Sequence, residues 1–191
     1  VPKGKAWFIK PEFYSFLTLK EQIAQMNTLG FDNIVRLTKN WRNGDCKRLT
    51  TRLNYLRSII KMAYPRQAVS HYFKHTFPYD RFQSWGGAYE KHDLIICPEK
   101  KSCDIWTEKY KNLEKYKIKM NCRDYCNGQI VFEKPPKVNS ELRHGFTIHA
   151  IQGETAQANL IIDMTKMKSL EMFYTAISRA KTYEQIWLYK K

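Results

Sequence analysis

The residue with the most unusual chemical setting is Arg179. It lies in the run Ala176-Ile-Ser-Arg-Ala180, inside a helix predicted from Ser169 to Lys181. The neighbouring side chains are small or apolar, and a permanently charged guanidinium enters such surroundings when it has an anion to meet. The sequence therefore indicates that Arg179 binds an anionic group.

A second polar stretch follows a strand predicted at residues 146–148. Thr147 and His149 lead into Gln152-Gly153-Glu154, where the glycine exposes the backbone. In a parallel sheet these groups would lie at the carboxyl edge, where open α/β sheets bind their ligands. An isolated histidine is more often structural, so the case for His149 depends on the pattern around it.

The elements that must position these residues alternate between short apolar runs and helical segments, which predicts an α/β fold with a parallel sheet. Residues 94–97 have the continuous apolar character of a buried strand, and a helix that Ser102 could cap follows Pro98. Another helix is predicted where leucines and an isoleucine recur at helical spacing, at Leu49, Leu53, Leu56 and Ile60. Further strands are predicted at 6–9, 34–37, 159–163 and 185–189.

Two segments depart from this alternation. Residues 64–90 contain prolines, paired glycines and many aromatic side chains but no clean period, which predicts an irregular insertion or loop. Residues 116–138 alternate as a β segment, with Asn127-Gly128 as a hairpin turn before a returning strand at 129–132. We therefore expect one domain over 1–191 that carries these two insertions.

The composition favours nucleic acid as a partner. The 191 residues include 33 Lys and Arg against 18 Asp and Glu, a net charge of +15, and 14% of them are aromatic. Cations can hold phosphates while rings stack on bases, although a solvated basic surface is the alternative. No stretch approaches the ~18 continuous apolar residues of a membrane span, and the first residues lack the apolar core of a signal peptide. We expect a soluble, intracellular protein that does not bind membranes.

The cysteines do not indicate a structural framework. They are odd in number and irregularly spaced, which predicts reduced thiols: Cys46, Cys97, Cys103, Cys122 and Cys126. Cys122 and Cys126 could hold a metal ion only with ligands from elsewhere in the chain. No metal site is predicted.

Three segments, in this order, resemble the second-domain motifs of superfamily 1 DNA helicases, closest to the RecD-like branch. Residues 37–42, Leu-Thr-Lys-Asn-Trp-Arg, resemble the L-x-x-x-x-R segment around motif IV. Residues 146–155 resemble motif V, commonly T-x-H-x-x-Q-G-x-T, and residues 173–181 resemble motif VI, commonly Y-V-A-x-S-R. The three segments lie between residues 37 and 181 and comprise 25 of the 191 residues. The resemblance implies a second RecA-like motor domain: a parallel sheet flanked by helices, with a small β-hairpin or SH3-like insertion at 116–138.

The resemblance also implies roles at a nucleotide site. Gln152, Gly153 and Glu154 would face ATP bound between two motor domains, and Arg179 and Arg42 would act as arginine fingers on the γ-phosphate. A planar guanidinium can stabilise the charge that develops there, which raises the rate by ~10³ or more. Arg42 also fits a surface cation among Arg36, Lys39 and Lys47.

On the DNA side, the resemblance assigns Thr147, His149 and Thr155 to the backbone of single-stranded DNA, which they would couple to the ATP site. Lys100 and Lys101 follow the strand at 94–97. They fit phosphate contacts or the solvated first turn of a helix equally well.

The parts of an ATPase that the sequence lacks bear on its function. It contains neither a G-x-x-x-x-G-K-[ST] loop nor an apolar strand that ends in an acidic pair. ATP and Mg²⁺ would therefore be held mainly by an N-terminal RecA-like domain of the same polypeptide. We expect this chain to be an excised C-terminal fragment that hydrolyses no ATP alone.

Two other interpretations remain open. A non-enzymatic, basic nucleic-acid-binding module would explain the charge, but it would not explain Arg179 or the Gln152-Gly153-Glu154 run. A viral superfamily 1 RNA helicase has similar motifs, although the Ala-Ile-Ser-Arg form fits the DNA-acting branch better. The sequences Gln-Gly-Glu-Thr and Tyr-Thr-Ala-Ile-Ser-Arg-Ala, in the segments that resemble motifs V and VI, are also similar to those of replicative helicases of large DNA viruses. That similarity would place the protein in the cytoplasm, the nucleus or a viral replication compartment.

Overall fold

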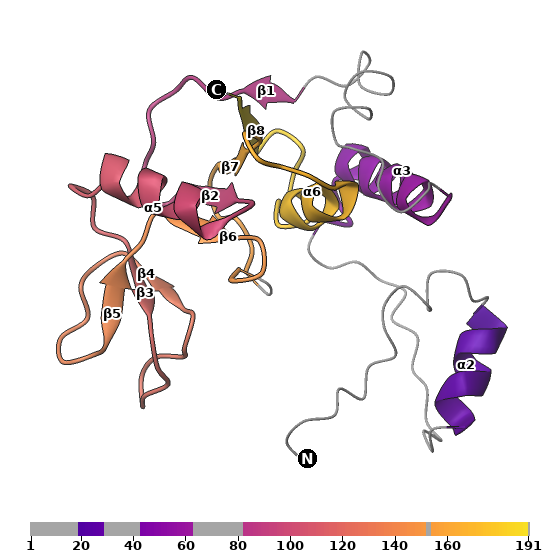
Figure 1. Cartoon of the computed structure of the whole chain (residues 1–191), viewed down its shortest axis with the longest axis horizontal. Helices are drawn as coiled ribbons and strands as arrows, with labels where there is room; N and C mark the ends of the chain where they lie inside the picture. Colours follow the sequence, from indigo (N-terminus) through magenta and orange to yellow (C-terminus); the bar gives the residue numbers. More distant parts are fainter. Residues whose placement is uncertain (1–18, 29–42, 63–81, 152–153, 191) are drawn as a thin grey trace. The chain divides into compact units, whose positions relative to one another are not determined.

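The computed structural model describes residues 19–28, 43–62, 82–151 and 154–190 (Figure 1). The strands predicted at 6–9 and 34–37 lie outside these ranges, as do Arg42, Gln152 and Gly153. The chain divides into two compact units, Val1–Asn40 and Trp41–Lys191. The first contains one described helix, α2 (Leu19–Thr28). All other described elements belong to the second.

The second unit is built on a five-stranded parallel sheet with strand order β1-β8-β7-β2-β6. The strands are β1 (Gln83–Ser84), β2 (Leu94–Cys97), β6 (Gly145–Thr147), β7 (Leu160–Asp163) and β8 (Ile186–Tyr189). Both central strands, β2 and β7, are buried along their whole length. Such strands are covered on both faces, which is why they are apolar at successive positions.

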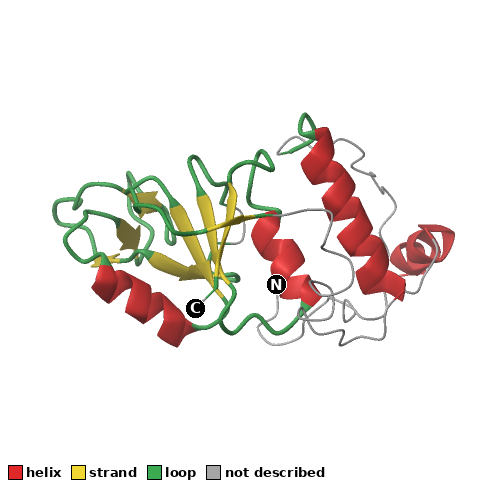
Figure 2. Cartoon of the chain, turned by 90° about the horizontal axis from the view of Figure 1, so that it is seen from above, coloured by secondary structure: helices red, strands yellow, loops and turns green. Residues whose placement is uncertain are grey.

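Helices cover both faces of this sheet (Figure 2). The helices α3 (Lys47–Met62) and α6 (Leu170–Ile177) share one apolar core with β2 and β7, to which α3 contributes Leu49, Leu53 and Leu56. On the other face, α5 (Lys100–Lys109) packs Cys103 and Trp106 against Ile95 and Ile161. The α/β fold expected from the sequence and the leucine-rich helix are confirmed.

A second sheet lies between α5 and β6 in the sequence. It is antiparallel, with order β4-β3-β5, and consists of β3 (Tyr116–Ile118), β4 (Ile130–Val131) and β5 (Ser140–Leu142). β3 and β4 pair as the expected antiparallel hairpin, but residues 119–129 rather than Asn127-Gly128 alone join them, and a third strand follows. Gly128 has φ of 91° and lies in the returning arm, where its N–H donates to the Ile118 carbonyl at 2.9 Å. We call β3, β4 and β5 the inserted sheet.

Three local expectations are corrected. The end of the segment predicted to be irregular contains β1, which pairs with β8. Helix α5 begins after Glu99 rather than after Ser102, which is buried in its first turn. Helix α6 ends at Ile177, so Arg179 follows the helix instead of lying in its middle. Helical spacing identifies a helix more reliably than its last residue.

Gly145 allows β6 to lie close to α5. A Cβ at this position would lie 2.7 Å from the Cys103 Cα and 2.9 Å from the Cys103 carbonyl oxygen. Among the described helices, none is both long and apolar enough to cross a membrane.

Candidate nucleic-acid interface

A cationic cleft of about 220 Å³ lies at the carboxyl edge of β6, between α5 and the inserted sheet. Cys97 of β2 pairs with Thr147 of β6, so both strands end at this edge and the chain leaves β2 towards α5. The cleft is lined by four cations, one carboxylate and three uncharged residues: Lys100, Lys117, Lys119, Arg143, Glu141, Phe146, Thr147 and Ala150. An excess of cations at a sheet edge fits an anionic ligand such as a phosphate chain.

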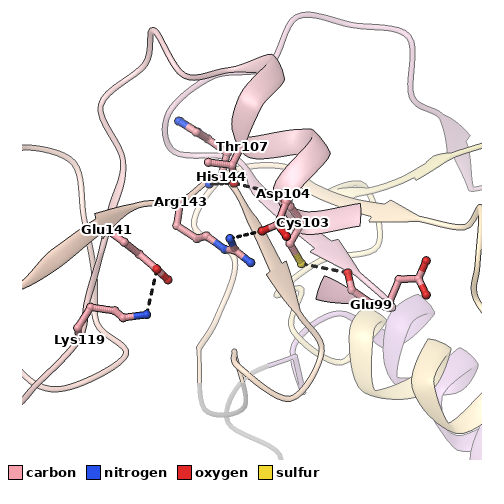
Figure 3. A network of polar contacts seen from close by, with 8 residues as sticks. All are labelled: Glu99, Cys103, Asp104, Thr107, Lys119, Glu141, Arg143 and His144. Carbon is pink, nitrogen blue, oxygen red and sulfur yellow. Dashed lines mark hydrogen bonds and ion pairs between the residues drawn. The ribbon is translucent and has the colours of Figure 1, made fainter. Parts of the chain in front are cut away.

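Two ion pairs hold part of this charge (Figure 3). The Lys119 Nζ lies 2.9 Å from the Glu141 Oε2, and the two side chains are 45% and 38% exposed. The Arg143 Nη1 lies 2.6 Å from the Asp104 Oδ1 on α5, where the arginine side chain is 15% exposed. Within the described part of the chain, no carboxylate forms an ion pair with Lys100 or Lys117.

Thr147 lies where the sequence places it, at the end of β6, and it lines the cleft. Its carbonyl and its Oγ1 both accept from the Ala150 N–H, at 3.0 Å and 3.3 Å, so the side chain also stabilises the turn that follows β6. His149 is exposed in that turn. Lys101 is exposed beside Lys100 on α5, but neither Lys101 nor His149 lines the cleft.

Glu154 and Thr155 lie at the opposite edge of the sheet. Both line a smaller cavity of about 50 Å³ with Leu94, the first residue of β2, and with Gln157, which precedes β7. The expectation that Glu154 lies at the carboxyl edge is wrong, because the chain turns back after β6. Thr147 and Thr155, both expected to contact DNA, line different cavities.

Arg179 also lies at this amino edge, because α6 runs back from the end of β7. It is half-buried, so the expected burial is corrected. Its Nε donates to the Thr175 carbonyl at 3.2 Å and its Nη2 to the Ser178 Oγ at 3.1 Å. Carbonyls at the end of a helix favour a cation, which supplies a second reason for an arginine here. The Arg179 carbonyl accepts from the Ala156 N–H at 2.9 Å, and this bond joins the segment that resembles motif VI to the residue that directly follows the segment resembling motif V.

Sequence reasoning missed three cleft cations: Lys117, Lys119 and Arg143. The alternation of Tyr116-Lys-Ile-Lys-Met120 placed both lysines on one face of a strand, and that signal could have identified them. Arg143 could not be added from local pattern, because its position depends on a pairing of β5 with β3.

A buried polar cluster lies at the amino-edge end of the inserted sheet. It consists of Tyr89, Asp93, Lys115 and His144, of which Lys115 is 1% exposed and His144 is fully buried. The Lys115 Nζ donates to the Asp93 carbonyl and, at 3.2 Å, to the Tyr89 hydroxyl. That hydroxyl lies 3.0 Å from the His144 Nδ1, and the His144 Nε2 lies 3.0 Å from the Leu113 carbonyl. Sequence reasoning did not identify this cluster.

Burial determines the ionisation of these groups. It lowers the pKa of Lys115 to about 7, against the opposing attraction of Asp93. It also lowers the pKa of His144 to about 4, although the hydrogen bond to the Leu113 carbonyl acts the other way. A neutral His144 with its proton on Nε2 satisfies the chain, because Nδ1 then accepts from Tyr89. The cluster is therefore a satisfied structural network.

Comparison with known proteins supports the fold. No family model matches the sequence, and no curated protein matches it either. The solved structures that it resembles include the Pif1 helicase from Candida albicans, with a TM-score of 0.56 and 11% identity over 84% of this chain. They also include the Pif1 helicase from Bacteroides in complex with ADP-AlF3 and single-stranded DNA, with a TM-score of 0.53 and 16% identity over 90% of this chain.

A second Bacteroides Pif1 structure, bound to single-stranded DNA, gives a TM-score of 0.54 with 15% identity. The match spans 57% of the Candida protein and 58% of each Bacteroides protein, which is less than two thirds of their length. At these identities the likeness concerns the fold. The second unit has an α/β, RecA-like fold that matches part of these Pif1 helicases.

Proposed function

We propose that this chain is the second motor domain of an ATP-dependent DNA helicase or translocase. The observation that carries the proposal is the separation of two polar sites at opposite edges of one RecA-like sheet. The cationic cleft lies at the carboxyl edge, and the junction of Arg179 with Ala156 lies at the amino edge. A motor domain needs both a surface for the nucleic-acid backbone and a surface that faces nucleotide.

The cleft suits single-stranded DNA. Lysine and arginine side chains release counterions when they bind phosphates, which makes affinity independent of sequence but sensitive to salt. Lys100 and Lys117 supply charge, and the Thr147 hydroxyl can still donate a hydrogen bond to a phosphate oxygen. His149 and Lys101 are exposed beside the cleft and could extend the contact. Thr155 is a less direct candidate, because it lines the amino-edge cavity.

At the amino edge, the proposed role of Arg179 is to meet the γ-phosphate of ATP bound to another RecA-like domain. Its two hydrogen bonds to Thr175 and Ser178 use the Nε and one Nη, which orients the planar group. By the same resemblance, Gln152, Gly153 and Glu154 would face the nucleotide, and Arg42 would supply a second guanidinium. Mg²⁺ would be held together with ATP by the other domain.

The test is a comparison of two single-lysine variants by fluorescence anisotropy with labelled oligo-deoxythymidine. We expect Lys100→Ala to weaken binding several-fold and to reduce the slope of log affinity against log salt by about 1. Lys91→Ala is the matched control, because Lys91 is exposed near the amino edge, outside the cleft. Equal losses in both variants would show that general basic charge, rather than the cleft, binds DNA.

A second measurement addresses the amino edge. We expect the 191-residue chain alone to hydrolyse no ATP, because it lacks a phosphate-binding loop. In a polypeptide that also carries the N-terminal domain, Arg179→Ala should abolish turnover while nucleotide binding stays largely intact, since the arginine meets charge that develops in the transition state. Lys at this position should rescue poorly. If Arg179→Ala hydrolyses ATP at near the wild-type rate, the arginine has only a structural role at the end of α6.

A further inference from the structure

We propose that Glu141 regulates the cationic cleft as an internal competitor of the DNA phosphate. Its carboxylate forms an ion pair with the Lys119 ammonium. Single-stranded DNA binds with all of the cleft cations only when a phosphate displaces the Glu141 carboxylate from Lys119. This inference rests on the proposed function of the cleft as the DNA-binding site.

The pairing of the inserted sheet places the charges on one face. Lys117 of β3 lies directly opposite Glu141 of β5, and Lys119 follows two positions later on the same face. Arg143 follows Glu141 by two positions and also lines the cleft. Alternate residues of a strand share a face, so the cleft wall carries three cations and one carboxylate. Among the eight lining residues, Glu141 is the one acid.

The two ion pairs at the cleft differ in what they can do. Asp104 holds Arg143 from α5 and does not line the cleft, so this pair leaves the cleft surface cationic. The Glu141 carboxylate lies inside, 2.9 Å from the Lys119 Nζ. Figure 3 shows Lys119 and Glu141 facing one another on the inserted sheet, apart from the Arg143–Asp104 contact.

The Lys119–Glu141 pair is suited to displacement. Both side chains are more than a third exposed, and pairs in such positions are screened by water and contribute little to stability. A phosphate oxygen can accept a hydrogen bond from the Lys119 ammonium as well as the Glu141 carboxylate does. While the carboxylate is in place, however, its negative charge repels the phosphate. The carboxylate therefore lowers affinity and reduces the number of counterions that Lys119 can release on binding.

The experiment is a salt titration of the whole chain with oligo-deoxythymidine. Glu141→Gln keeps the size of the side chain and removes its charge. We expect affinity at low salt to rise roughly twofold to fivefold, and the slope of log affinity against log salt to steepen by up to about 1. A side chain with a purely structural role would not move the slope in this direction.

Glu108→Gln is the matched control. It removes the same charge and breaks an exposed ion pair, with the Lys111 Nζ at 2.6 Å, but Glu108 lies outside the cleft. We expect its affinity and salt slope to match those of the wild type. An equal gain in both variants would overturn the proposal, because net charge alone would then explain the effect.

A double-mutant comparison completes the test. Lys119→Ala should weaken DNA binding more in the Glu141→Gln background than in the wild type. In the Glu141→Gln protein no carboxylate competes for Lys119 before DNA binds, so the lysine contributes more to the affinity. Additive effects would contradict competition for Lys119. If Lys100→Ala weakens binding while Glu141→Gln changes nothing, the cleft binds DNA and the competitor role is wrong. If neither variant changes binding, the proposed DNA site itself fails.

Discussion

Lys115 and Lys119 flank the same short strand, β3, and have opposite surroundings. Lys115 precedes the strand and is 1% exposed, with its ammonium directed to a carbonyl and a hydroxyl. Lys119 follows the strand, and its side chain is 45% exposed beside a carboxylate. One residue type thus serves two purposes: the buried lysine fixes the inserted sheet to the parallel sheet, and the exposed lysine remains available to a ligand.

The difference follows from the cost of charge in each place. The Lys119 side chain is solvated, and an ion pair in such a position can exchange one partner for another at little cost. Burial disfavours the ammonium of Lys115 and lowers its pKa to about 7, so near neutral pH much of this residue is an uncharged hydrogen-bond donor. The charged form of Lys115 is destabilised by burial, and the buried ammonium cannot contact DNA.

The largest effect that we expect is a pH dependence of stability that arises from Lys115, at the buried end of β3. Between pH 7 and 10.5 the unfolded chain keeps the Lys115 proton while the folded chain loses it, so stability rises as pH rises through this window. The gain from pH 7 to pH 10 is roughly 3 kcal/mol for a shift of this size. His144 acts in the same direction at lower pH, because stability falls as pH drops from 6.5 through about 4.

Urea unfolding followed by tryptophan fluorescence at several pH values up to about 9.5 measures this dependence; the raised pKa of Tyr89 acts in the opposite direction above pH 10. Lys115→Met should remove the rise above pH 7, whereas Lys91→Met, an exposed lysine, should keep it. A rise that persists in Lys115→Met would assign the pH dependence to other groups.

A smaller effect is expected from Tyr89→Phe. The hydroxyl accepts from Lys115 and donates to His144, so its removal leaves two buried polar groups without one of their partners. A loss of roughly 2 kcal/mol of unfolding free energy is expected. Tyr55→Phe is a suitable control, because Tyr55 is 42% exposed on α3. If both variants lose the same stability, the hydroxyl network does not fix the inserted sheet.

The sequence predicted well those elements whose own residues carry the signal. β2 and the first three residues of β7 are continuous apolar runs because both faces of these strands are covered, and α3 shows its buried stripe directly as Leu49, Leu53 and Leu56. In contrast, β1 has two residues and β5 is Ser-Glu-Leu, which show no alternation long enough to recognise. Their existence depends on partners that are distant in the sequence.

The site was predicted in part for the same reason. Thr147 and Lys100 lie at strand ends that local pattern identifies, and both line the cleft. Lys119, Glu141 and Arg143 join them through the pairing of β3 with β5, which no local pattern gives. The sequence placed Glu154 at the carboxyl edge of the sheet, whereas the structure places it at the amino edge. The local pattern identifies strand β6 but does not show that the chain returns towards the amino edge after the strand ends.

The smallest effect is expected at the open end, from Lys119→Ala. Because the lysine is 45% exposed and its partner 38% exposed, removal of the ion pair should change the unfolding free energy by less than about 0.5 kcal/mol. The same variant should weaken DNA binding in the Glu141→Gln background, so stability and binding should respond separately at this end. At the buried end, Tyr89→Phe should lower stability while leaving the charge of the cleft unchanged. Urea unfolding and anisotropy on the same preparations compare the two ends. A loss of stability in Lys119→Ala as large as that in Tyr89→Phe would show that the exposed pair is also structural, and the contrast between the two lysines of β3 would then be wrong.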